Sequence, residues 1–319
     1  MNARAASTVI AVALAFVAVF AGLRTGNKVL DTDEAVYQRT LRSMRSGEGY
    51  FPAMRDALIV KEKARPTSVR AIRPPTLFLF LRWFPEGSWR WLVGLVYLAV
   101  LLSMARLGEP YGRYGAIVAT LAGGIWMIGA SSYLYLHAEL WGLPFFLAGL
   151  LAVRRDDDVR APALFAAATL IRELYGVGLL VGLVMSKRRR PWLLATAIVI
   201  ALAGVHVWLA HSVLSPSGRE VGLGNEPITI HSILRFLSPG DRSVAFALGI
   251  IMLAAGFAGI ARNLRDRAAA LLLPFGAIML VAGVVATRAY WNLTYGPAVS
   301  AFVAAALSAP FRTAMQEPE

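Results

Sequence analysis

The chain has 319 residues, of which 57% are hydrophobic and only 16% are charged, with a net charge of +13. Soluble domains average about 25% charged residues, so this composition indicates an integral membrane protein, whose cations serve cytoplasmic loops and anionic lipid rather than nucleic acid. The lack of cysteine excludes disulfides, thiolate metal ligands and cysteine nucleophiles, and the four histidines lack the spacing of a zinc site.

The first predicted span covers residues 6–23, an apolar segment that follows Arg4. A spanning helix needs about 20 mostly apolar residues, which this segment nearly supplies. A cleaved signal peptide has a similar pattern, but further spans follow, so we expect a retained anchor. Residues 24–88 then form a long polar outer loop.

Apolar segments recur along nearly all of the remaining chain. The stretch 161–190 is apolar but interrupted by Arg172 and Glu173, and a charged pair at mid-membrane is costly, so we expect two short helices that meet at this pair. The other predicted spans cover residues 89–105, 114–131, 138–153, 192–214, 244–261, 268–286 and 293–309. Residues 1–319 are therefore expected to form a single all-α polytopic membrane domain of about ten segments, without a soluble C-terminal domain.

The charges of the short loops predict the orientation. With the N-terminus in the cytoplasm, the inner connections include RRDDDVR, SKRRR and RNLRDR, whereas the short outer connections carry few cations. The positive-inside rule then places both termini in the cytoplasm, and the alanine-, arginine- and valine-rich composition suggests a bacterial inner or plasma membrane. A second long outer loop covers residues 215–242 and contains an amphipathic segment that suits the membrane interface.

Three carboxylates open the first outer loop. Either Asp31 or Asp33 is placed to cap a helix over residues 34–46, which Gly47 would help to end. With Asp31 as the cap, Glu34 falls at the third helical position in a variant of the capping box. Asp33 is then the carboxylate that remains for chemistry.

The helix at 34–46 has one apolar and one basic face, which predicts that it lies along the membrane interface. A second juxtamembrane helix is expected after Pro75, too short to span the membrane and stopped by Pro85. The basic stretch 54–75 lies between the two helices. Its cations either hold a lipid phosphate or attract headgroups in general.

The order of these features resembles that of a known family. A first transmembrane helix precedes an acidic D-E-x-x-Y motif, an amphipathic helix, a Gly-aromatic turn and a basic residue before proline. This pattern resembles the GT-C superfamily of membrane glycosyltransferases, which includes aminoarabinose, mannosyl and arabinosyl transferases. The matching residues are Asp33, Glu34, Tyr37, Gly49, Tyr50, Arg73, Pro74 and Pro75. The interruption at Arg172 and Glu173 also resembles the short helices of that superfamily.

The resemblance implies an inverting enzyme that moves a sugar from a polyprenyl-phosphate donor to a glycan, lipid or protein acceptor on the outer side of the membrane. Such a displacement needs a carboxylate for the acceptor and cations for the leaving phosphate. Asp33 matches the first acidic residue of the motif and is the expected base, with Asp31 and Glu34 as alternates. The candidates for binding the donor phosphate are Arg73, which matches the basic residue before proline, Arg172 and Arg288.

Further polar groups on the outer side are expected to converge on this site. The predicted substrate-binding residues are Tyr37, His137, Glu139, Glu173, Tyr290 and Tyr295. Some of them have structural alternatives, because Arg172 and Glu173 suit a mutual ion pair and the two last tyrosines suit an aromatic belt at the interface.

Metal dependence and two other function classes stay open at this point. We expect no metal, because basic residues already supply positive charge; the alternative is a divalent cation held by the oxygens of Asp31 and Asp33. A transporter or flippase for a lipid-linked anion would explain the basic outer loop, although the sequence lacks the pseudo-symmetric halves typical of transporters. A non-catalytic subunit that binds lipid is the third possibility.

Overall fold

The computed structural model describes residues 3–25, 33–62, 66, 68–69, 72–131, 136–214, 243–286 and 292–308. These residues are helical for the most part, and no β-strand occurs among them, which confirms the all-α class. The larger group of helices is α1 (Ala3–Thr25), α5 (Trp89–Gly108), α6 (Gly115–Ser131), α7 (Ala138–Arg154), α8 (Arg160–Ile171), α9 (Gly176–Met185), α10 (Arg189–His211), α12 (Ser243–Arg262), α13 (Arg267–Ala286), α14 (Asn292–Ser300) and α15 (Val303–Ala306). The first predicted outer loop contains α2 (Asp33–Arg45), α3 (Tyr50–Glu62) and α4 (Thr76–Leu81).

Three helices in the described part of the chain are long and apolar enough to cross a membrane. They are Ala3–Phe20 within α1, Glu86–Tyr111 around α5, and Arg189–His211, which is α10. Shorter apolar helices cover Gly115–Met127, Arg160–Ile171, Glu173–Met185, Ala247–Arg262 and Arg267–Gly283. Length and composition therefore support a membrane protein, whereas the predicted count of about ten segments stays a prediction.

Most helices of the larger group begin and end within a few residues of the predicted positions. The span predicted at 89–105, for example, is α5. The interrupted stretch 161–190 also divides as predicted, because α8 ends at Ile171 and the 3-10 turn η4 (Glu173–Tyr175) leads directly into α9. Hydropathy and one charged pair are sufficient signals here.

The segment predicted as a single span at 293–309 is not one continuous helix, because two short helices, α14 and α15, occupy this region, and its crossing of the membrane stays a prediction. At the break, the N–H of Phe302 bonds to the carbonyl of Val299, and the N–H of Ala305 bonds to that of Phe302, so the helix tightens into three-residue spacing. Hydropathy does not detect this change, because residues on both sides of the break are apolar and buried.

The end of α2 follows the prediction closely. Gly47 has a φ of 101°, and the N–H of Glu48 bonds to the carbonyl of Ser43 at 3.1 Å. This is the Schellman arrangement, in which glycine adopts the left-handed conformation without a steric penalty. The turn sends the chain back, so that α3 packs against α2.

Helix α3 was not predicted, since its residues fall in the stretch that the sequence suggested to be a basic connection. Its buried face consists of Ala53, Met54, Ala57 and Leu58, which recur at helical spacing. That periodicity is a usable signal, but the neighbouring charges obscure it. The consequence for the site is that α3 carries Lys61 toward the start of α2.

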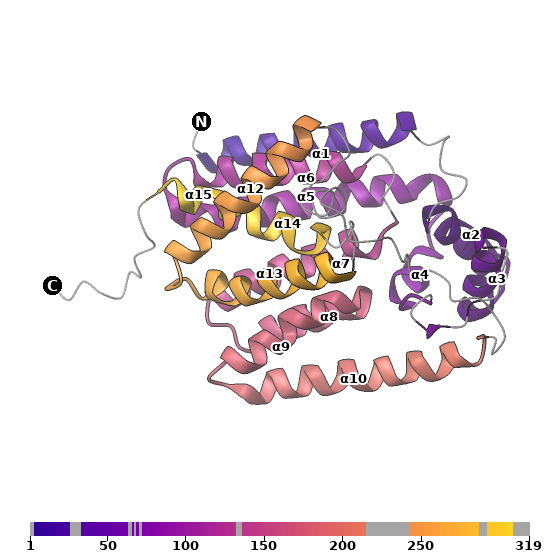
Figure 1. Cartoon of the computed structure of the whole chain (residues 1–319). Helices are drawn as coiled ribbons and strands as arrows, with labels where there is room; N and C mark the ends of the chain where they lie inside the picture. Colours follow the sequence, from indigo (N-terminus) through magenta and orange to yellow (C-terminus); the bar gives the residue numbers. More distant parts are fainter. Residues whose placement is uncertain are drawn as a thin grey trace.

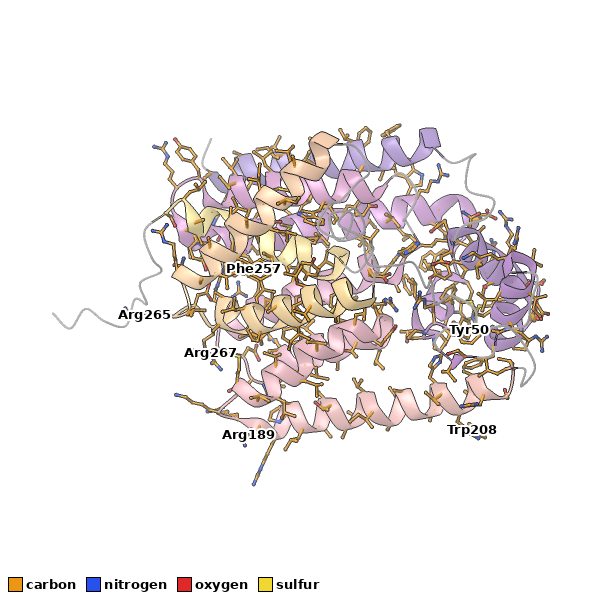
Figure 2. The ribbon with its side chains drawn as sticks, viewed as in Figure 1. Tyr50, Arg189, Trp208, Phe257, Arg265 and Arg267 are labelled. Carbon is orange, nitrogen blue, oxygen red and sulfur yellow. The ribbon has the colours of Figure 1, made fainter. Side chains whose placement is uncertain are left out.

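The helices are arranged with two distinct ends (Figure 1). Helices α2, α3 and α4 gather at one end of the larger group, and α10 runs along one side toward them. There, Nε2 of His206 donates to the carbonyl of Ile72 at 3.1 Å, and its ring stacks on Phe51. Arg189, Arg265 and Arg267 lie at the opposite end from Tyr50, so one end of the molecule carries exposed cations from the short basic loops (Figure 2).

A buried ion pair fastens the basic end. Nη2 of Arg154 lies 2.5 Å from Oδ2 of Asp266, which also accepts a hydrogen bond from the Tyr111 hydroxyl. Nη1 of Arg154 donates to the carbonyl of Leu107 at 3.0 Å. These bonds join the ends of α5 and α7 to the connection between α12 and α13, so the network is structural.

Close packing between α12 and the broken C-terminal helices allows one prediction. A Cβ at Gly259 would clash with the carbonyl oxygen of Phe302, whereas a Cβ at Gly204 in α10 would meet open space. We expect Gly259→Ala to destabilise the protein by about 1–3 kcal/mol through overpacking. The matched control Gly204→Ala should be neutral or stabilising by up to about 1 kcal/mol, because alanine favours helix. Thermal unfolding of the detergent-purified variants measures both, and equal shifts would contradict this packing.

Candidate active site

Asp33 is the first residue of α2, and its side chain is 41% exposed. Its Oδ1 lies 2.7 Å from Nζ of Lys61 on α3. Burial by itself would raise the pKa of Asp33, but His137 in its protonated form, Lys61 and Arg73 lower it below the usual value. Asp33 is therefore an ionised, accessible carboxylate at neutral pH, as a proton acceptor needs to be.

Glu34, the next residue, has the opposite environment. Its side chain is buried, and Oε2 accepts a hydrogen bond from the N–H of Leu136 at 3.2 Å. Burial raises the pKa of Glu34 to about 8, against the effects of Leu136 and Gln38, so this carboxyl is largely protonated at neutral pH. The predicted capping role of Glu34 is wrong, because tertiary packing directs the carboxyl to the segment before α7. Asp31, the other member of that pair, lies outside the described residues.

Arg73 is positioned by two tyrosines. Its Nε donates to the hydroxyl of Tyr37 at 3.3 Å, and the Tyr50 hydroxyl donates to its carbonyl oxygen at 2.5 Å. The Tyr37 ring packs edge-on against Phe78 and His137. Three residues of the matched motifs, on α2, α3 and the segment before α4, are thus in direct contact.

Arg172 occupies the break between α8 and α9. Its backbone is extended, with φ −145° and ψ 113°, which ends α8 and directs the side chain into the protein. The guanidinium is only 2% exposed, and its Nε donates to Oε1 of Glu139 at 2.8 Å. Tyr175 also binds Glu139, because its hydroxyl donates to the backbone carbonyl of Glu139 at 2.6 Å. The interruption of the helix therefore supplies a buried, paired cation.

Glu173 links Arg172 to Arg73. Its Oε1 contacts Nη1 of Arg172 and lies 3.8 Å from Nη1 of Arg73. The side chain of Glu173 is 53% exposed, unlike that of Arg172. The ion pair expected between Arg172 and Glu173 is therefore present, and Arg73 joins it.

His137 lies at the N-terminus of α7, between Glu139 on that helix and Tyr37 on α2. Its Nδ1 is 3.8 Å from Oε2 of Glu139, and its ring centroid is 5.5 Å from that of Tyr37. Burial lowers the pKa of His137, which keeps the ring largely neutral at pH 7. The imidazole therefore acts here as a packed polar spacer between α2 and α7.

The structure thus brings together most of the predicted site residues that it describes. The cluster consists of Asp33, Tyr37, Arg73, His137, Glu139, Arg172 and Glu173, together with Lys61 and Tyr50. Lys61 was not among the predicted site residues; the basic stretch was the only signal for it. The cluster contains three carboxylates, Asp33, Glu139 and Glu173, and three cations, Lys61, Arg73 and Arg172, so its formal charges balance.

The remaining predicted residues have other positions. Tyr295 is fully buried in α14, and its assignment to the substrate site stays a prediction. Arg288 and Tyr290 lie outside the described residues, as does the second outer loop at 215–242. Across the described segments, no group of three or more histidine or acidic residues is arranged to hold a metal ion.

Comparison with known proteins adds no relative. No protein-family model matches the chain, and neither the curated proteins nor the solved structures give a match. The chemistry of the cluster is therefore inferred from its own residues and from the motifs that they form.

The buried pair of Arg172 and Glu139 leads to a stability prediction. Arg172→Met leaves the buried carboxylate without its cation and should destabilise the protein by about 3–5 kcal/mol. Adding Glu139→Gln should restore part of the loss, because the unpaired charge is removed. The control is Arg42→Met, which breaks an exposed pair with Glu86 and should change stability by less than about 1 kcal/mol. If thermal unfolding ranks the single variants equally, the buried pair does not have this role.

The protonation of Glu34 leads to a pH prediction. Because its pKa is raised from 4.5 to about 8 on folding, its contribution to stability is full below pH 4.5 and declines as the pH rises through 8. Glu34→Gln keeps an oxygen acceptor for Leu136 and cannot ionise. Its melting temperature relative to the wild type should therefore rise as the pH increases from 5 to about 8 and level off above that.

A glutamate with the opposite shift provides the control. Arg42 lowers the pKa of Glu86, so that Glu86→Gln should lose stability relative to the wild type as the pH rises toward 4.5 and should then stay level above pH 4.5. Parallel pH curves for the two variants would show that Glu34 is not held protonated.

Proposed function

We propose that the protein is an inverting, GT-C-type glycosyltransferase with about ten membrane segments, which transfers a sugar from a polyprenyl phosphate to an acceptor outside the membrane. One observation carries the proposal. An exposed, ionised carboxylate, Asp33, lies in the same cluster as two guanidiniums, Arg73 and Arg172, although these residues are far apart in the sequence.

The roles follow from what a single displacement requires. Asp33 accepts the proton of the acceptor hydroxyl, and the acceptor oxygen forms its bond to the anomeric carbon. The bond from that carbon to the phosphate oxygen breaks, and the phosphate leaves with the electron pair. Arg73 and Arg172 stabilise the charge that develops on the phosphate. Attack opposite to the leaving group inverts the anomeric configuration.

The surroundings of the cluster suit a lipid-linked donor. The short helix α4 follows Arg73 directly, and Leu79, Phe80 and Trp83 in and after it are exposed to a large extent. Exposed apolar side chains beside cations are typical of an element at the membrane interface. A prenyl chain would lie in the membrane while its phosphate stays near Arg73.

The cations of the cluster supply the positive charge that a metal would otherwise bring to the phosphate. We therefore favour a metal-independent reaction at the outer face of a bacterial plasma membrane, with both termini in the cytoplasm. Addition of a chelator should leave such a reaction unchanged.

The test replaces the proposed base. Asp33→Asn keeps the size of the side chain but removes the proton acceptor, so sugar transfer should fall by about 10²–10⁴-fold. Transfer is measured in proteoliposomes supplied with donors that link mannose, arabinose or aminoarabinose to undecaprenyl or decaprenyl phosphate. The control Asp56→Asn changes a carboxylate on α3 that pairs only with its exposed neighbour Arg55 among the ion pairs described.

Three outcomes separate the alternatives. Transfer that depends on Asp33 but not on Asp56 supports the enzyme. Wild-type transfer in Asp33→Asn shows that the base is a different residue. Movement of the donor lipid across the bilayer without any sugar transfer supports a flippase.

A further inference from the structure

Glu173 has an unusual position within the cluster, because one of its oxygens faces two guanidiniums. Oε1 contacts Nη1 of Arg172 and lies 3.8 Å from Nη1 of Arg73. The exposed fraction of the side chain is 53% for Glu173, 29% for Arg73 and 2% for Arg172. The shared anion is therefore the outermost of the three groups.

The other carboxylate of Arg172 behaves differently. Glu139 is 6% exposed and receives the Nε of Arg172 at 2.8 Å, while its backbone carbonyl accepts the Tyr175 hydroxyl. Removal of a buried counterion is strongly unfavourable, whereas a carboxylate that is already half exposed is readily hydrated when it leaves its partners. Glu139 is thus the permanent partner of Arg172, and Glu173 is the replaceable one.

A phosphate group suits the place that Glu173 occupies. Guanidiniums bind phosphate and carboxylate through the same parallel N–H donors, and phosphate offers more oxygens to two of them than one carboxylate does. When Glu173 leaves, two carboxylates, Glu139 and Asp33, remain in the cluster against the three cations Arg73, Arg172 and Lys61. The vacated position is then a site of net positive charge.

We propose that Glu173 is an internal anion that occupies a phosphate site between Arg73 and Arg172 and moves into solvent when a phosphate ester binds. The identification of that ester as a polyprenyl-phosphate donor rests on the proposed function. The sequence predicted that Glu173 binds the substrate. In this proposal Glu173 instead competes with the substrate phosphate for the two guanidiniums. It is a residue that sets donor affinity and helps the product phosphate to leave.

The competition predicts a specific effect of neutralising Glu173. Glu173→Gln keeps the shape of the side chain but removes the charge that repels the phosphate and pairs with the arginines. We expect undecaprenyl phosphate to bind roughly tenfold more tightly to this variant, which corresponds to about 1.4 kcal/mol. In turnover, KM for the donor should fall, and kcat should fall with it if release of the product phosphate is slow.

Binding is measured on the full chain in nanodiscs with three probes: undecaprenyl phosphate, the neutral polyprenol and inorganic phosphate. Polyprenol binding should not change in Glu173→Gln. Competition by inorganic phosphate at similar concentrations would identify free phosphate as the ligand instead of the lipid. The control Glu86→Gln neutralises another exposed glutamate that pairs with an arginine, outside the cluster, and should leave all three affinities unchanged.

A double variant keeps the test decisive. Adding Arg73→Gln to Glu173→Gln should abolish the gain in affinity, because one of the two cations is lost. Undecaprenyl phosphate that binds Glu173→Gln no more tightly than wild type, with thermal unfolding unchanged, overturns the inference. Should Glu173→Gln unfold, Glu173→Ala is measured in the same way, and the same criterion applies.

The two proposals fail in different ways. Tighter phosphate binding in Glu173→Gln without sugar transfer by the wild type would retain the phosphate site and reject the glycosyltransferase. Transfer by the wild type, together with unchanged affinity in Glu173→Gln, would retain the enzyme and reject the displaced carboxylate.

Discussion

The buried ion pair between Arg172 and Glu139 is the constraint on which the rest of the site depends. A guanidinium that is 2% exposed within an apolar stretch is unfavourable unless a carboxylate compensates it. The helix therefore breaks between α8 and α9, which brings Arg172 to the start of α7. From this pair, contacts continue to His137 on one side and through Glu173 to Arg73 on the other. One charge thus joins the larger helix group to the segment before α4.

The two ends of the molecule use buried charge for different purposes. At the basic end, Arg154, Asp266 and Tyr111 bind one another, and the Asp266 carboxylate is fully buried, so this network serves the packing of helices. At the other end, the inner charges are equally buried, but Asp33 and Glu173 are about half exposed. Of these two described networks, the second is the one with carboxylates that a ligand can reach without disrupting the fold.

Neighbouring carboxylates acquire different properties at the start of α2. Asp33 stays ionised beside Lys61 and Arg73, whereas burial keeps the adjacent Glu34 largely protonated. Pairs of acidic groups whose environments separate their pKa values are typical of sites that perform acid–base chemistry. Here the buried member fastens α2 to the segment before α7, and the exposed member reaches solvent. Position on the helix surface, rather than residue type, assigns the two roles.

The sequence by itself determined the all-α class, the approximate bounds of most helices, the break at Arg172 and the glycine that ends α2, because hydropathy, a charged pair and turn chemistry act over a few residues. It did not reveal α3 or the division of the last span, where packing outweighs the local pattern. Only the tertiary structure decided that Glu34 meets Leu136 and that Lys61 meets Asp33. Such contacts join residues that are distant in the sequence, and no local periodicity encodes which face of a helix will meet them.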